Sequence, residues 1–264
     1  MRVTMGSMKT LAIANHKGGV GKTATTHALG ELTARDHHLR VLMVDLDPQA
    51  SLTLAAGIQD AAGQSLAEIL GGTRPSRTPL ANIVRDLGDS LWLAPADIAL
   101  AAAELQLVAR MGREVVLRKA LATVAEDYDL CLIDCPPSLG MLTLNGLAAA
   151  QAVLVPAQPT AVDLRALRSF LDSLEAVRSE INPQLTTLGI LPTFYDARLS
   201  HHAQALEALA GSGAPLLPIR IGRSIRVAEA AAASSSVVSF ATDNPQAENY
   251  RALAKVVTKW LRNQ

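Results

Sequence analysis

Cysteine is scarce in this chain: only Cys131 and Cys135 occur among its 264 residues. Both lie in or beside an apolar run with no other metal ligands nearby, so we expect small buried thiols in a reducing cytosol rather than a metal site. No apolar stretch reaches the ~18–20 residues that cross a bilayer, and residues 1–9 are too short and polar for a secretory signal. These absences predict a cytoplasmic protein without a membrane span.

An excess of charge is also missing, because 24 basic residues balance 24 acidic ones. This balance argues against a protein coated with positive charge for nucleic acid, although a local basic patch can still steer a polyanion. Hydrophobic residues make up 49% of the chain, enough for one large buried core. Neither an internal repeat nor a clear domain boundary is visible. We expect a flexible N-terminal extension over residues 1–8 and a single domain over residues 9–264.

Short apolar runs alternate with helical segments along the chain. The expected strands are residues 11–14, 41–44, 91–94, 130–133, 152–155 and 187–191, and the expected helices are 22–34, 113–126, 162–179, 201–210 and 247–262. Apolar strands separated by helices predict an α/β fold with a single doubly wound, mostly parallel sheet flanked by helices. We expect short helices and loops over 59–89, and a surface loop or frayed helix end over 231–236.

A glycine-rich loop follows the first expected strand and precedes the first expected helix. Its glycines let backbone amides turn inward, and the helix N-terminus adds partial positive charge, which suits phosphate binding. In such a loop Lys22 bridges the β- and γ-phosphates and the Thr23 hydroxyl ligates Mg²⁺. We therefore expect nucleotide contacts from Lys17, Gly18, Gly19, Val20, Gly21, Lys22, Thr23 and Ala24.

The loop departs from the common form G-x-x-x-x-G-K-[ST], because His16 stands at the place of the first glycine and Lys17 follows it. The run 17–23 resembles the deviant Walker A motif of the ParA/MinD family of ATPases. The resemblance implies that Lys17 reaches across a dimer interface to the nucleotide of the partner subunit. A cation at the rim can neutralise a γ-phosphate brought face to face with it, whereas Lys22 already holds the phosphate of its own subunit.

Three aspartates end two of the expected strands. Asp45 and Asp47 lie two residues apart and point the same way in an extended backbone, and Asp134 ends the strand 130–133. Carboxylates at strand ends near a phosphate loop order Mg²⁺ and its water. By resemblance to the two switch segments of the family, Asp47 orients the attacking water, while Asp134 and Asp45 serve the metal through water. Hydrolysis then needs no protein nucleophile, and the absence of an Asn-Lys-x-Asp sequence favours ATP over GTP.

Arginines recur late in the chain. Arg220, Arg223 and Arg226 are spaced by three, which predicts one helical face or a tight loop that suits phosphate contacts. From the residues alone, a solvated face or salt bridges to Glu229 explain this spacing as well. No aromatic residue interleaves with them, so we expect no stacking on bases. The resemblance, which extends over nearly the whole chain, implies that Arg198, Arg223 and Arg226 bind DNA.

The family resemblance implies a biological role as well. It predicts an ATPase that is weak alone, forms an ATP-dependent homodimer, and binds double-stranded DNA without sequence preference, associated with the nucleoid. A ParB/Spo0J-like protein would stimulate it in chromosome or plasmid partition. Because the loop begins at residue 16, we expect no preceding helix-turn-helix and no operator binding. Ala24, Gly222 and residues 231–236 depart from the family pattern near the nucleotide and the DNA surface.

Alternatives stay open. The apolar stripe over residues 253–261 has helical spacing with basic residues opposite, which suits a MinD-like membrane helix, but core packing is favoured and no stable membrane association is expected. A ParA-like ATPase that positions a protein cargo fits the same motifs. An iron–sulphur carrier is disfavoured, since Cys131 lies within a strand. A metabolic ligase of the same superfamily would need a substrate pocket beside the γ-phosphate, which the sequence neither shows nor excludes.

Overall fold

The structure is a computed structural model that describes residues 8–72, 76, 78–211 and 213–263. Its eight strands form one sheet in the order β3-β4-β2-β5-β1-β6-β7-β8. Neighbouring strands are parallel except β3 and β4, which pair antiparallel at one edge. The strands are β1 (Lys9–Ile13), β2 (Val41–Asp45), β3 (Arg85–Gly88), β4 (Leu91–Ala94), β5 (Leu130–Asp134), β6 (Ala152–Ala157), β7 (Thr186–Tyr195) and β8 (Ile221–Gly222).

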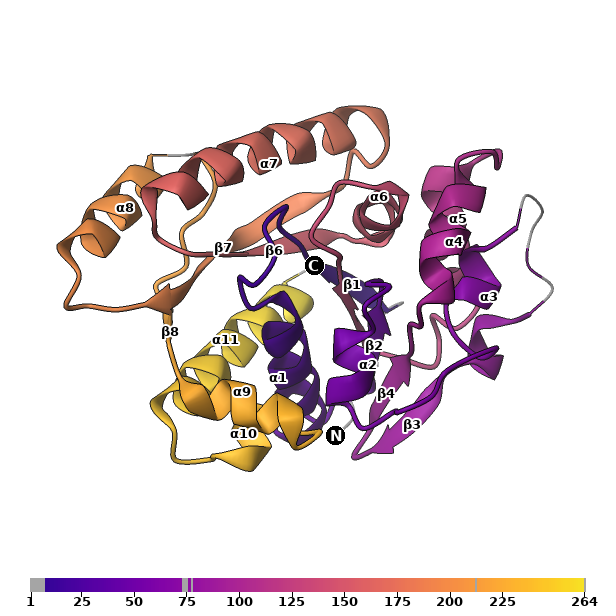
Figure 1. The fold of residues 1–264 in the computed structure, drawn as a ribbon, viewed down its shortest axis with the longest axis horizontal. Coiled ribbons are helices and arrows are strands. Elements are labelled where there is room, and N and C mark those ends of the chain that lie inside the picture. The colour runs from indigo at the N-terminus through magenta and orange to yellow at the C-terminus, as the bar shows by residue number, and fades with distance from the viewer. Residues whose placement is uncertain (1–7, 73–75, 77, 212, 264) are drawn as a thin grey trace.

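Helices cover both faces of this sheet (Figure 1). On one face lie α1 (Lys22–Arg35), α2 (Ser51–Ala55), α9 (Ile225–Ala232), α10 (Val237–Phe240) and α11 (Pro245–Arg262). On the other lie α3 (Ala67–Leu70), α4 (Ala99–Leu107), α5 (Val116–Ala122), α6 (Met141–Ala149), α7 (Ala161–Glu180) and α8 (Ser200–Ala210). Two 3₁₀ turns, η1 (Leu80–Asn82) and η2 (Arg113–Val115), complete the described helical segments.

The sheet separates two hydrophobic cores, and each central strand contributes to both. In β1, Leu11 and Ile13 face the core under α1 and α11, whereas Ala12 faces the core under α6 and α7. Successive side chains of a strand point to opposite faces, so a strand covered on both sides is apolar throughout. The expected fold class, a doubly wound mostly parallel sheet, is confirmed.

The structure adds elements that the hydrophobic pattern did not predict. The edge strand β3 is polar and half-exposed, and β8 has only two residues, so neither gives a clear apolar run. Residues 231–236 contain the end of α9 and the turn after it, as expected of a frayed helix end. The expected extension 1–8 lies outside the described residues except Met8, which is buried and donates its backbone N–H to the carbonyl of Ala125 at 3.3 Å.

The C-terminal apolar stripe packs inside the protein. Leu253, Val257 and Leu261 are buried in the core under α1, and Val256 and Trp260 pack against its rim. The expectation of core packing for α11 is therefore confirmed, and the stripe gives a membrane helix no support. No helix in the described part of the chain is long and apolar enough to span a membrane. Both cysteines are free and buried, as expected.

Candidate functional site

The phosphate loop joins the C-terminal end of β1 to the N-terminus of α1, between β5 and β6. This is the point where the strand order reverses, which is where doubly wound sheets bind ligands. Gly19 and Gly21 have φ of 69° and 85°, a left-handed conformation that side chains with a Cβ rarely adopt. Asn15 fixes the start of the loop, since its Nδ2 donates to the carbonyl of Pro156 at 2.7 Å and its Oδ1 accepts from the Lys17 amide at 3.1 Å.

Lys22 lies inside the curve of the loop and is only 7% exposed. Its Nζ donates to the carbonyls of Lys17 at 2.9 Å and Asn15 at 3.3 Å. Burial lowers the pKa of Lys22, and the charges of Asp134 and Asp47, among other nearby groups, act against that shift. The ammonium group therefore sits where a phosphate held by the loop would reach it.

Two buried carboxylates stand side by side at the end of the sheet. Asp45 of β2 pairs in register with Asp134 of β5, and both are fully buried. Burial raises the pKa of Asp45 to about 6, against the hydrogen bonds that it accepts. Burial, followed by the charge of Asp45, raises the pKa of Asp134 well above its usual value. Two neighbouring buried carboxylates repel each other when both are ionised, and this destabilises the fold unless a cation binds between them.

The two carboxylates differ in their partners. Asp45 uses both oxygens on protein donors: Oδ2 accepts from the amide and hydroxyl of Thr53 at 2.8 and 2.7 Å, and Oδ1 from the Asp47 amide at 3.1 Å. Asp134 accepts from the Thr23 hydroxyl at 2.7 Å through Oδ2, while its Oδ1 is buried without a hydrogen-bond partner among the described residues. Asp45 therefore shapes the loop that carries Asp47, and Asp134 offers a free oxygen.

The residues around Thr23 fit a magnesium ion. A hydroxyl and a carboxylate with an orphaned buried oxygen are hard oxygen donors, which Mg²⁺ prefers, and this ion keeps water and phosphate as its other ligands. Among the described residues no group of three or more His, Cys, Asp and Glu could hold a metal by itself. The donor set thus suits a metal that arrives with a nucleotide.

Lys17 points away from the loop interior. Its Nζ donates to Oδ1 of Asp163, at the start of α7, and its side chain is 40% exposed. Asp163 is 4% exposed and also accepts from the hydroxyl of Thr160, the N-cap of α7, at 2.6 Å. Lys17, the lysine that the common form of the loop lacks, is therefore held at the rim by Asp163, a buried carboxylate of its own chain.

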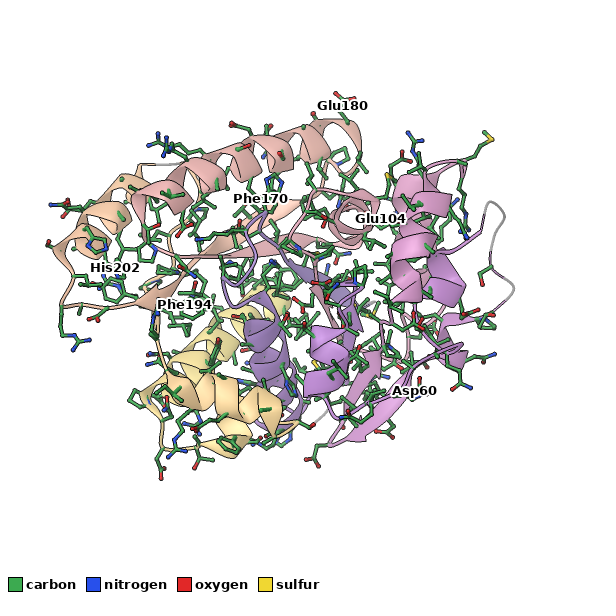
Figure 2. All side chains as sticks on the ribbon, viewed as in Figure 1. Asp60, Glu104, Phe170, Glu180, Phe194 and His202 are labelled. Carbon is green, nitrogen blue, oxygen red and sulfur yellow. The ribbon has the colours of Figure 1, made fainter. Side chains whose placement is uncertain are left out.

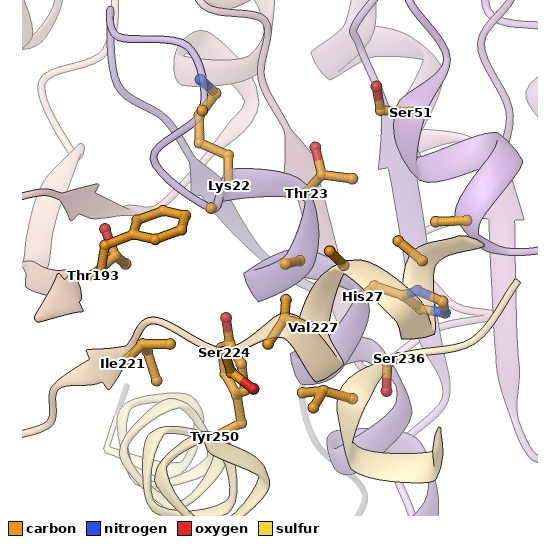
Figure 3. Close-up of a pocket in the computed structure, with 18 of the residues that line it drawn as sticks. Lys22, Thr23, His27, Ser51, Thr193, Ile221, Ser224, Val227, Ser236 and Tyr250 are labelled. Atoms are coloured by element: carbon orange, nitrogen blue, oxygen red, sulfur yellow. The ribbon is translucent and has the colours of Figure 1, made fainter. Parts of the chain in front are cut away.

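A cavity of about 470 Å³ opens beside the phosphate loop (Figure 3). The expected residues Gly18, Gly19, Gly21, Lys22, Thr23, Ala24 and Asp47 line it, whereas Lys17 and Val20 do not. Val20 is instead buried, with 1% of its surface exposed. Apolar and aromatic groups from the ends of β7 and β8 and from α9 and α11 form the far wall, including Phe194, Ile221, Val227 and Tyr250. A cavity of this size and lining suits a nucleoside attached to the phosphates.

The expected DNA-binding arginines do not share one helical face. Arg220 precedes the strand β8, Arg223 lies in the connection after β8, and only Arg226 lies in the helix α9. The three-residue spacing therefore runs through a strand and a loop before it reaches a helix. Of the two arrangements that the spacing predicted, one helical face or a tight loop, the helical face is therefore wrong. Arg226 pairs with Glu229 at 2.8 Å, which is the salt bridge that the residues alone allowed, and Arg198 forms a two-bond pair with Asp196, which they did not predict.

Two aromatic rings at the end of β7 support the other arginines. The guanidinium of Arg220 lies 4.6 Å from the centre of the Tyr195 ring, and that of Arg223 lies 5.6 Å from the centre of the Phe194 ring. No acidic partner of Arg220 or Arg223 is found among the described residues. These contacts hold both cations in place without neutralising them.

Sequence reasoning missed several residues of this site. Asn15, Asp163 and Phe194 lie outside the recognised motifs, and two of them come from segments far from the loop in the sequence. A signal existed for Asp163, since Thr160 and Asp163 form an N-cap pattern at the start of an expected helix. Phe194 and Tyr195 are the last two residues of β7, and only the fold brings them under Arg223 and Arg220.

Known proteins resemble this chain over nearly its full length. A family model described as AAA domain matches residues 8–187. The chromosome-partitioning ATPase Soj of Thermus thermophilus is 40% identical over 252 residues, which cover 95% of both chains. The chromosome partitioning protein ParA of Myxococcus xanthus is 35% identical, over 95% of this chain and 88% of its own.

A solved structure has a similar fold over nearly the whole chain. It is named cobyrinic acid a,c-diamide synthase from Mycobacterium smegmatis and contains an ATP analogue and magnesium. It is 36% identical to this chain, covers 97% of each chain, and has a TM-score of 0.83. Sequence, fold and loop geometry agree, and the chain belongs to the ParA/Soj family of P-loop ATPases.

Proposed function

We propose that this protein is an ATP-dependent switch that dimerises on ATP and Mg²⁺, binds double-stranded DNA without sequence preference, and segregates DNA with a ParB-like partner. The observation that carries the proposal is the arrangement at the phosphate loop, where Lys22 lies inside and Lys17 lies at the exposed rim. In this proposal Lys22 holds the phosphates of its own subunit, and Lys17 meets the nucleotide of a second subunit.

Hydrolysis of ATP follows from the residues around the loop. Magnesium, when bound, would be held by Thr23 and Asp134 and would neutralise charge on the phosphates. Asp45 fixes the backbone of Asp47, whose side chain lines the cavity and is placed to orient a water molecule for in-line attack. Lys22 stabilises the charge that develops on the γ-phosphate. The activity is expected to be weak until a second subunit excludes water.

DNA binding is supported by the cations at the ends of β7 and β8. Arg223 lies over Phe194, and Phe194 in turn lies 3.9 Å from the position of a Cβ on Gly21. A ring that contacts both the phosphate loop and an arginine connects the nucleotide to the DNA surface. Arg198 and Arg226 would exchange their local carboxylates for phosphates, which weakens their contribution.

The test uses Asp47→Ala and Lys17→Ala together. Asp47→Ala is expected to bind ATP, to hydrolyse it at a rate lower by roughly 100-fold or more, and to accumulate as a dimer on DNA. Lys17→Ala should bind ATP yet form neither the dimer nor the DNA complex. Light scattering reports the dimer, and binding to DNA-coated beads reports the complex. If Lys17→Ala still dimerises and binds DNA with ATP, the cross-subunit role is wrong.

A metabolic ligase is a second candidate, because the similar structure from Mycobacterium smegmatis bears the name of a diamide synthase. Such an enzyme would pass the γ-phosphate to a small carboxylic acid before amide formation. Incubation with ATP and analysis of the products separates the candidates. Free phosphate that increases with DNA and a ParB-like protein favours the switch, whereas a phosphate release that depends on a small carboxylic acid favours the ligase.

A further inference from the structure

Helix α4 is apolar on two opposite faces. One face packs on the core through Leu100, Ala103 and Leu107, which are at most 3% exposed. The opposite face carries Ile98 and Leu105, which are 73% and 77% exposed. Between and beside these two lie further exposed apolar residues, namely Ala99, Ala101, Ala102, Val108 and Ala109. Glu104 and the exposed Gln106 are the polar side chains of α4, and an exposed apolar stripe of this length beside them indicates a contact with another molecule.

The outer stripe is complementary to itself. When two copies of α4 lie antiparallel about a two-fold axis centred between residues 103 and 104, each large side chain meets an alanine of the other copy. The pairs are Ile98 with Ala109, Leu105 with Ala102, and Val108 with Ala99. The same register places Asp97 of one copy opposite Arg110 of the other. Large against small and acid against base is the pattern required of an isologous interface.

We propose that this outer stripe, residues 98–109 of α4 and its two flanking turns, pairs with the same stripe of a second copy and forms part of the dimer interface. This inference rests on the proposed function, since it names a surface of the ATP-dependent dimer. Two short helices bury less than the ~1,000 Å² that a stable interface requires, so the stripe needs a neighbouring contact. The phosphate loop with Lys17 supplies that contact.

The fold connects α4 to the nucleotide end of the sheet. Oε1 of Glu104 accepts from the amide of Leu142 at 3.2 Å, at the start of α6 (Figure 2). The same carboxylate lies against Gly140, where a Cβ would collide with it. Residues 135–140 join Asp134 to α6, so α4 packs directly on the segment that follows the buried carboxylate. The stripe is thus continuous with the switch segment through Glu104.

A charge placed in the stripe tests the proposal. Leu105→Glu should weaken ATP-dependent dimerisation by roughly tenfold or more, because one carboxylate from each copy would be buried in the interface, against Ala102 of the other copy. The exposed Ala176 on α7 gives a matched control, since Ala176→Glu adds the same charge on a helix face without the stripe. Sedimentation with a non-hydrolysable ATP analogue measures the dimer, and a fluorescent nucleotide measures binding by the monomer. Nucleotide binding and thermal unfolding of Leu105→Glu should match the wild type.

Cross-linking tests the register independently. Native Cys131 and Cys135 are buried, so introduced cysteines can be labelled selectively. A mixture of Ala102→Cys and Leu105→Cys chains, treated with a short bismaleimide and the ATP analogue, should give a covalent dimer. The pair Ala102→Cys with Glu180→Cys, at the far end of α7, should give none.

The outcomes separate the two hypotheses. If the wild type does not dimerise on the ATP analogue, the proposed function fails. If the wild type dimerises while Leu105→Glu dimerises equally and the mixture gives no cross-link, the stripe is not in the interface and this inference alone is wrong. Loss of stimulation by a ParB-like protein in Leu105→Glu, with the dimer intact, would overturn the inference in favour of a partner protein on α4.

Discussion

The phosphate loop and the arginine surface are held in place in different ways. Lys22 is buried and its Nζ has two backbone acceptors within the loop, so its position follows from a few consecutive residues. Arg198, Arg223 and Arg226 come from three segments, and Arg198 is 88% exposed. The first region is fixed by local backbone geometry, whereas the second depends on the pairing of β7 with β8 and on nearby acids.

This contrast has an energetic reason. A buried charged group without its partners costs several kcal/mol, so few arrangements of the loop are stable. Exposed arginines lose little when they change partners, since a surface salt bridge contributes about 0–1 kcal/mol. Substitutions in the loop should therefore have large effects and single substitutions in the arginine surface smaller ones. Each prediction below tests this order.

Substitution of the buried lysine should have the largest effect. Lys22→Ala removes the cation that faces the β- and γ-phosphates, and ATP affinity should fall by roughly 1,000-fold, about 4 kcal/mol. Titration with a fluorescent ATP analogue measures the change. Lys119→Ala, an exposed lysine on α5, is the control and should bind as the wild type does. A loss of only a few-fold in Lys22→Ala would show that backbone amides alone hold the phosphates.

The same contrast explains what the sequence could predict. The loop, the strand ends with Asp45 and Asp134, and the helix α1 follow from local patterns, and the structure brings Thr23 to within 2.7 Å of Asp134. The prediction that Arg220, Arg223 and Arg226 share one helical face was wrong. A three-residue spacing of arginines does not reveal that a two-residue edge strand, β8, lies between the first two of them. The partners Asp163 and Phe194 needed the fold, since pairing between distant segments leaves no local periodicity.

Glu31 connects the two regions. It lies in the second half of α1, the helix that follows the phosphate loop, and accepts from the hydroxyl of Ser236, the N-cap of α10, at 2.6 Å. Burial acts to raise the pKa of Glu31, but hydrogen bonds from His27, Ser236 and Ser239 and the charge of His27 outweigh it and lower the pKa to about 2. The segment that follows the arginine-bearing α9 is thus tied to the helix of the phosphate loop.

Stability should depend on pH through this carboxylate. A depressed carboxyl pKa contributes stability above the unfolded value near 4.5, and the contribution, about 3 kcal/mol, is lost as pH falls from 4.5 towards 2. Urea unfolding of Glu31→Gln should therefore differ from the wild type more at pH 5 than at pH 2, and the difference should shrink as the pH falls between them. Glu175→Gln, a surface residue paired with Arg178, is the control. A difference that stays constant with pH would mean that the ionised form of Glu31 is not what stabilises the fold.

Substitutions of Arg198, Arg223 and Arg226 should weaken DNA binding to different degrees. Arg223 rests on Phe194 and has no acidic partner among the described residues, so Arg223→Ala should weaken DNA binding about tenfold and lower the salt slope by about two, one contact per subunit. Arg198→Ala and Arg226→Ala should each have a smaller effect, because these side chains give up Asp196 or Glu229 when they bind phosphate. Binding at several salt concentrations measures both quantities. Equal losses for all three would contradict the order.

The contact between Lys17 and Asp163 should give the smallest effect and the finest test. Asp163 holds Lys17 within its own subunit, so Asp163→Asn should release the lysine and shift ATP-dependent dimerisation to lower protein concentration by about threefold, less than 1 kcal/mol. Asparagine keeps an oxygen for the Thr160 hydroxyl, and Asp172→Asn, exposed on the same helix, is the control.

A double-mutant cycle then identifies the cause. In the Lys17→Ala background, which is expected to form no dimer, the substitution Asp163→Asn should restore none, because the released group is absent. Weaker dimerisation in Asp163→Asn alone would mean the opposite role, in which Asp163 orients Lys17 toward the second subunit. An effect that persists without Lys17 would instead assign Asp163 to the stability of α7, since a buried carboxylate at a helix N-terminus stabilises that helix by itself.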